Sequence, residues 1–107
     1  MPNEKPSEQR AGWVAQARAA LIIAAMRRTL VTYGELGTAL GIEGVALRNH
    51  MRHVLDEVAR DCATNKEPSL AALVVNQETG QPGAGWQDGS VPWHTEVRAV
   101  FRHWPPK

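Results

Sequence analysis

The chain has 107 residues, with 12 lysines and arginines against 11 acidic residues, so it fits one compact domain with its own core. The near-neutral charge excludes a uniformly positive surface, and any nucleic-acid role must come from cations gathered on one face. The single cysteine, Cys62, excludes an internal disulfide and a cysteine-rich zinc site and favours a reducing compartment, so we expect a cytoplasmic protein.

The first part of the chain predicts a short leader followed by a long helix. Residues 1–7 hold two prolines and several charges with little to bury, which predicts a disordered leader before a single domain over 8–107. An apolar residue then recurs at every fourth position, at Trp13, Ala17, Leu21 and Ala25. This spacing predicts a core helix over about 8–28. Its apolar run, 19–26, is too short to span a bilayer, the first ten residues lack the pattern of a signal peptide, and no membrane association is expected.

Two helices in a helix-turn-helix arrangement are predicted next. Thr32 and the glutamate three residues later fit a capping box, so a short helix is expected to begin at Tyr33. Gly41 supplies the left-handed conformation that commonly ends a helix, and a second helix is expected from near Glu43 or Gly44. The second helix carries an apolar stripe that we expect to be buried, at Leu47, Met51, Leu55, Val58 and Cys62.

The outer face of this second helix carries cationic and amide side chains. Arg48 and Arg52 are four residues apart, as are Asn49 and His53, so all four lie on adjacent positions of one face. An arginine can bind guanine bidentately and an asparagine can bind adenine in the same way, which suits a DNA groove. The alternative is an ordinary solvated helix face.

The remaining chain predicts a strand, a glycine-rich loop and a final helix. The apolar, partly β-branched run Ser69–Val75 predicts a strand buried on both faces. Asn76–Gly85 has turn composition and predicts a hairpin or wing containing Gly80, Gly83 and Gly85. Helical spacing over 97–104 predicts a last helix that Pro105 ends, with a strand as the alternative. The expected fold class is therefore α+β: a small, helix-rich, winged-helix-like domain with a buried strand and a Gly-rich hairpin or wing.

The stretch ARAALIIAAMRRTLVTYGELGTALGIEGVALRNHMRHVL resembles the winged-helix part of the O6-alkylguanine DNA alkyltransferases and alkyltransferase-like proteins. Those proteins have a helix, a VTYGxLA-like helix and a recognition helix whose arginine enters the DNA stack. Thr32 and Tyr33 are expected among the DNA-binding residues, and the resemblance implies that Tyr33 matches the motif's tyrosine, which helps to rotate a nucleotide out. It implies that Arg48 fills the resulting gap, with Asn49 and Arg52 along the same helix. It continues loosely into PSLAALVVNQETGQPGAGW, a stretched form of PCHRVVN with its glycine turn.

The chain departs from this family at the reactive motif. After Pro68 it has Ser69, Leu70 and Ala71 where the family has its reactive cysteine, a histidine and an arginine. Cys62 falls on the apolar stripe of the preceding helix, where a buried, uncharged thiol is inert. We therefore expect no alkyl transfer, and the sequence favours a non-enzymatic protein that binds duplex DNA.

Metal and nucleotide cofactors are not expected. His50 and His53 with Cys62 are the nearest approach to a zinc site, but no fourth ligand is close in the sequence. The glycine-rich loop lacks the lysine and the serine or threonine of a phosphate-binding P-loop.

Two alternative functions stay open. A small nuclease or toxin domain is one, because the residue types of a metal-independent ribonuclease occur at His94, Glu96, Arg98 and His103. A small phage-like or defence-related protein-interaction modulator is the other, which would use Trp86 and Trp93 if their rings are exposed. Core packing of these rings and a solvated final helix are the plainer interpretations.

Overall fold

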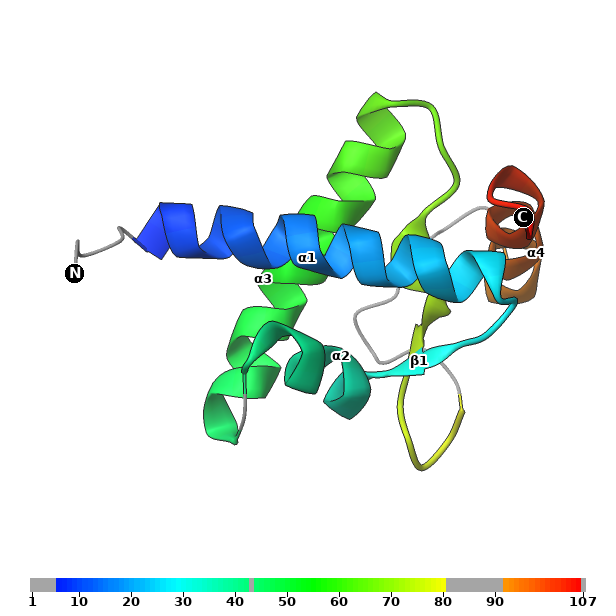
Figure 1. Cartoon of the computed structure of the whole chain (residues 1–107). Coiled ribbons are helices and arrows are strands. Elements are labelled where there is room, and N and C mark those ends of the chain that lie inside the picture. The colour runs from blue at the N-terminus through cyan, green and yellow to red at the C-terminus, as the bar shows by residue number, and fades with distance from the viewer. Residues whose placement is uncertain (1–5, 43, 81–91, 107) are drawn as a thin grey trace.

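A computed structural model describes residues 6–42, 44–80 and 92–106 of the chain (Figure 1). Its elements in chain order are α1 (Pro6–Met26), β1 (Val31–Thr32), α2 (Tyr33–Leu40), α3 (Val45–Thr64), the 3-10 helix η1 (Leu70–Leu73), β2 (Val74–Val75) and α4 (Trp93–His103). The domain is therefore helix-rich, with one small two-stranded sheet, and the general α+β class is confirmed. None of the described helices has the length and apolar character needed to cross a membrane.

The first helix crosses α3 and forms one side of the core (Figure 1). It begins two residues earlier than expected, at Pro6, where the missing amide hydrogen of proline costs no helical hydrogen bond; residues 1–5 of the expected leader lie outside the described residues. It ends at Met26 because Arg28 takes the left-handed conformation, with φ 57°. The Thr29 amide then donates to the Ala24 carbonyl at 2.9 Å, which closes the helix in a Schellman motif.

The capping box of α2 is confirmed. Thr32 Oγ1 accepts the Glu35 amide at 3.0 Å, and Glu35 Oε1 accepts the Thr32 amide at 2.9 Å. Gly41 ends the helix in the left-handed conformation, with φ 76°, as expected from its sequence position. After Gly44, whose φ is 67°, α3 begins at Val45, so the two predicted helices are present and are joined by a short connection.

The apolar stripe of α3 is confirmed at three of its five positions, and the other two are only partly buried. Met51, Val58 and Cys62 are buried, whereas Leu47 and Leu55 are only partly buried. Val54, which was not part of the expected stripe, is fully buried. The sequence period identified the helix, but the contacts of α3 with its neighbouring helices decide which positions are covered.

The predicted strand over Ser69–Val75 is wrong in conformation, although its burial is right. Leu70–Leu73 forms η1, and only Val74–Val75 is extended, paired in parallel with β1 in the register Val31 to Val74. Two side chains of α4 hold η1: Trp93 Nε1 donates to the Ala72 carbonyl at 2.6 Å, and Glu96 Oε2 accepts the Ser69 amide at 2.6 Å. These long-range hydrogen bonds decide between two conformations that an apolar run alone does not distinguish.

The final helix is confirmed but begins at Trp93, four residues before its expected start at Val97. Val100 is its fully buried residue, and Trp104 follows it before Pro105. Of the predicted wing, the structure describes the turn up to Gly80; its other glycines, Gly83 and Gly85, lie outside the described residues. The sheet in the described part of the chain is parallel, so it contains no antiparallel hairpin.

A partly buried ion pair ties α1 to the segment after α3. Arg18 Nη2 donates to Glu67 Oε2 at 2.9 Å and lies 2.8 Å from Oε1. Arg18 Nη1 also lies 3.7 Å from Cys62 Sγ. Burial opposes the charge on Arg18, but the hydrogen bond and negative charge of Glu67 outweigh it and raise the pKa of the guanidinium. The pair therefore fixes the far end of α3 against α1.

Candidate nucleic-acid interface

The first half of α3 exposes the four residues that the sequence predicts to contact DNA. Arg48, Asn49, Arg52 and His53 are all exposed, while Met51 on the opposite face is 2% exposed. Residues 45–53 include two arginines and two histidines and no acid, whereas 54–64 include three acids and one arginine. Positive charge is thus concentrated at the N-terminal end of this helix.

No carboxylate neutralises this surface among the described residues. The ion pairs in the described part of the chain join Arg18 to Glu67 and Arg60 to Glu57, so neither Arg48 nor Arg52 has an acidic partner within that range. Free guanidinium groups on a rigid helix can approach a phosphate or a base edge without first breaking an internal pair. The surface is therefore available for an anionic partner.

Close packing between α2 and α3 sets the position of this surface. Gly37 is buried, and a Cβ atom added to it would overlap Leu47 Cδ1 and lie 2.9 Å from the Ile42 carbonyl oxygen. The Ile42 amide in turn donates to the Gly37 carbonyl at 2.8 Å. Because Leu47 immediately precedes Arg48, the glycine allows the close approach that positions the exposed face.

The two predicted contact residues at the start of α2 are less exposed than the four on α3. Thr32 is partly buried, and its hydroxyl caps α2. Tyr33 is partly buried and packs against the core. Both sit at the N-terminus of α2, and the proposed role of Tyr33 at the DNA follows from the family resemblance.

The two histidines and the cysteine of α3 lie in three different environments. The His50 ring lies 4.8 Å from the Trp13 ring, His53 is exposed, and Cys62 is fully buried. Within the described ranges, no three His, Cys, Asp or Glu side chains are grouped to hold a metal ion. Burial raises the pKa of the Cys62 thiol, so the nucleophilic thiolate is disfavoured.

The four predicted nuclease residues on α4 are not brought to one site. Glu96 is engaged by the Ser69 amide, and His103 packs edge-on against Trp104, with ring centroids 4.4 Å apart. His94 and Arg98 instead line a shared pocket. Cleavage requires an acid and a base that converge on one bond, and Glu96 is hydrogen-bonded within the fold; the nuclease alternative stays a prediction.

The tryptophans predicted as a protein-binding patch are described only in part. Trp93 is partly buried and its indole nitrogen is hydrogen-bonded to the Ala72 carbonyl, which supports a packing role. Trp86 lies outside the described residues.

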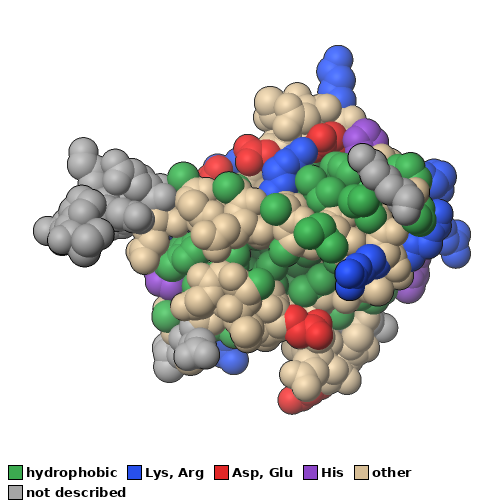
Figure 2. All heavy atoms as spheres, viewed as in Figure 1, with side chains coloured by type: hydrophobic (Ala, Val, Ile, Leu, Met, Phe, Trp, Pro, Cys, Tyr) green, Lys and Arg blue, Asp and Glu red, His purple; other side chains and the backbone are tan. Residues whose placement is uncertain are grey.

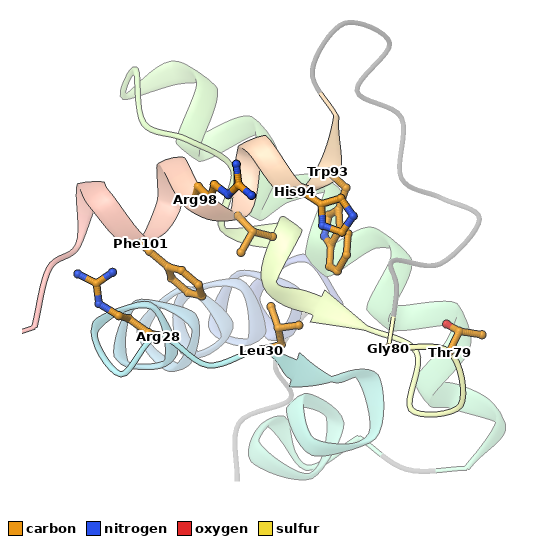
Figure 3. Close-up of a pocket in the computed structure, with 9 residues that line it drawn as sticks. Arg28, Leu30, Thr79, Gly80, Trp93, His94, Arg98 and Phe101 are labelled. Carbon is orange, nitrogen blue, oxygen red and sulfur yellow. The ribbon is translucent and has the colours of Figure 1, made fainter.

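A pocket of about 480 Å³ lies between α4, the end of α1 and the turn after β2 (Figure 3). Arg28 and Leu30 contribute from one side and Thr79 and Gly80 from another. Sequence reasoning missed this pocket because Arg28 is more than sixty residues from α4, and no local periodicity connects them.

Comparison of the chain with protein-family models, with curated proteins and with solved structures finds no match.

Proposed function

We propose that the protein is a non-enzymatic, duplex-DNA-binding domain in which α3 is the recognition helix. The observation that carries the proposal is the segregation of charge along α3: its first half presents exposed Arg48 and Arg52 with no acid in 45–53. This half follows directly on a glycine-supported turn from α2. In helix-turn-helix proteins the N-terminal residues of the second helix contact base edges in the major groove.

The exposed side chains fit both kinds of DNA contact. Arg48 and Asn49 lie at the start of the helix, where bidentate contacts to guanine and adenine are made. Arg52 lies one turn further along, where a contact to the phosphate backbone would fix the register. Because the net charge of the protein is close to zero, DNA binding is expected to depend on these few residues rather than on a general positive field.

The family resemblance supports the same proposal and its non-enzymatic form. The order of α1, α2 and α3 is the order that the alkyltransferase-like pattern predicts, and the segment after 76 is the proposed wing. Where that family has its reactive cysteine, this chain has Ser69, whose amide is bound to Glu96, followed by the fully buried Leu70. The alkyl acceptor of that family is a thiolate, and this position carries no thiol, so binding without alkyl transfer is proposed.

A fluorescence-anisotropy titration with duplex DNA at two or more salt concentrations tests the proposal. Arg48→Ala combined with Arg52→Ala should weaken binding at least tenfold, because the lost base contact alone costs about 1–3 kcal/mol, and should reduce the salt slope by about 1 through the lost phosphate contact. The matched control, Arg60→Ala with Arg102→Ala, removes the same charge from exposed positions elsewhere and should have little effect. Equal losses in both double variants, or no binding by the parent protein at low salt, would refute the proposal.

A further inference from the structure

The pocket beside α4 is not lined by any residue of α3, although Thr79 and Gly80 of its lining belong to the turn that we propose as the wing. Figure 1 shows α4 on the right of the molecule and the first turns of α3 at the lower left. The pocket volume, about 480 Å³, falls within the roughly 300–1,000 Å³ of small-molecule sites. A function independent of the helix-turn-helix pair is therefore physically reasonable for it.

Positive charge in the pocket is not balanced by acids. Arg28, His94 and Arg98 line it, and none of its lining residues is acidic. Glu96 is on the same helix, but its Oε2 atom is taken by the Ser69 amide. Figure 2 shows Lys, Arg and His side chains gathered on the right of the molecule, where α4 lies. The pocket therefore favours an anion.

Apolar side chains form the rest of the lining. Leu30 is 39% exposed, one of two large aliphatic side chains left exposed in the described part of the chain, and it faces the pocket with Val97 and Phe101. Figure 3 shows Phe101 between Arg28 and Arg98. An exposed leucine beside aromatic and cationic groups suits a ligand with an apolar body as well as a charge.

The backbone at Arg28 is the third observation. Its φ of 57° places a non-glycine residue in the left-handed region, which glycine adopts at lower energetic cost. Lys66 has a similar conformation outside the pocket, so at Arg28 the conformation serves to end α1. The same turn that ends α1 thus presents a guanidinium group to the pocket.

We propose that this pocket binds a small aromatic phosphate monoester, with Arg28 and Arg98 holding the phosphate and the ring packing against Leu30 and Phe101. Two guanidinium groups, one on either side of Phe101 (Figure 3), favour a phosphate dianion over a carboxylate because the phosphate carries more negative charge. The ring buries apolar surface that is otherwise exposed to water. This proposal does not depend on DNA binding by α3.

Phenyl phosphate is the first probe. Its binding is measured by the chemical-shift changes of the backbone amides of the whole protein. We expect saturable shifts at Arg28, Leu30, His94 and Arg98, with the Arg48 region unchanged. Phenol and inorganic phosphate, which each carry half of the ligand, should bind at least about tenfold more weakly, and benzoate should bind more weakly than phenyl phosphate because one charge is lost. Benzoate that binds as tightly as phenyl phosphate would overturn the assignment of a phosphate. The absence of any saturable shift at 10 mM phenyl phosphate, a concentration at roughly the weak limit of specific binding, would overturn the site.

Neighbouring arginines provide matched controls for the charge. Arg28→Gln and Arg98→Gln should each weaken phenyl phosphate binding about fivefold to tenfold, the range for charge-assisted contacts at a partly exposed site. Arg27→Gln and Arg102→Gln remove the same charge from exposed positions that do not line the pocket and should leave binding unchanged. Equal weakening in all four variants would mean that general surface charge, and not this pocket, attracts the ligand.

A glycine exchange separates ligand binding from folding. Arg28→Gly should raise the thermal midpoint, because glycine adopts the left-handed conformation without strain, while it weakens phenyl phosphate binding about fivefold or more, like the loss of the guanidinium in Arg28→Gln. Lys66, with φ 58°, is the matched position outside the pocket, and Lys66→Gly should raise the midpoint without changing binding. Unchanged binding by Arg28→Gly would remove Arg28 from the site and overturn the proposal.

Discussion

Substituting Gly37 by alanine tests how closely α2 and α3 are packed. The added methyl group would overlap Leu47 Cδ1 and lie 2.9 Å from the Ile42 carbonyl oxygen. The leucine can rotate, but the Ile42 peptide is held by its amide hydrogen bond to the Gly37 carbonyl, so the backbone cannot move away freely. Gly34 provides the control in the same helix, because a Cβ there meets only Thr32 Oγ1, at 4.0 Å.

The two substitutions should change the free energy of unfolding in opposite directions. Alanine in a helix gains about 0.5–1 kcal/mol over glycine, and this gain is unopposed at Gly34. At Gly37 an overpacking cost of about 1–3 kcal/mol outweighs it, which leaves Gly37→Ala less stable by about 1–2 kcal/mol. The two variants therefore differ by about 2–3 kcal/mol, equivalent to about 1 M in the urea midpoint for a protein of this size.

Urea unfolding followed by circular dichroism measures this difference, and a double-mutant cycle identifies its source. Leu47→Ala removes one of the two groups that the new methyl meets, so Gly37→Ala should cost about 1 kcal/mol less in that background than in the parent. Because Leu47 precedes Arg48, Gly37→Ala should also weaken DNA binding. If Gly37→Ala were as stable as Gly34→Ala with an unchanged slope, the close contact between the helices would be disproved.

Three further outcomes follow from the helix cap, the ion pair and the buried thiol. Thr32→Ala should lower the free energy of unfolding by about 1 kcal/mol because the Glu35 amide loses its acceptor, whereas the exposed Thr38→Ala should change it by less than about 0.5 kcal/mol; equal thermal midpoints would contradict the role of the cap. Arg18→Met should cost about 1–2 kcal/mol in chemical denaturation, since it leaves a carboxylate at Glu67 that is 16% exposed without its partner, and a neutral result would mean that the pair adds nothing. Cys62, whose pKa is raised by burial, should react with a thiol reagent at pH 9 only as fast as the protein opens, and rapid labelling of the native protein would show that the thiol is accessible.

Local sequence signals were sufficient for the helices. The capping box and Gly41 each act through hydrogen bonds within a few residues, so their outcome does not depend on the rest of the chain. The spacing of apolar residues identified α1, α3 and α4 for the same reason. The exposed face of Arg48, Asn49 and Arg52 followed from the period of α3, because the positions opposite a buried stripe are exposed.

Contacts between distant segments decided the remainder. Ser69–Val75 is apolar and buried in either conformation, and only the hydrogen bonds from Trp93 and Glu96 select a 3-10 helix over a strand. The same contacts bind Glu96, one of the predicted nuclease residues, to the Ser69 amide. The pocket of Arg28 and Arg98 likewise exists only where the end of α1 meets α4. Short-range hydrogen bonds are encoded by neighbouring residues, whereas the identity of a buried polar partner depends on which segments the folded chain places together.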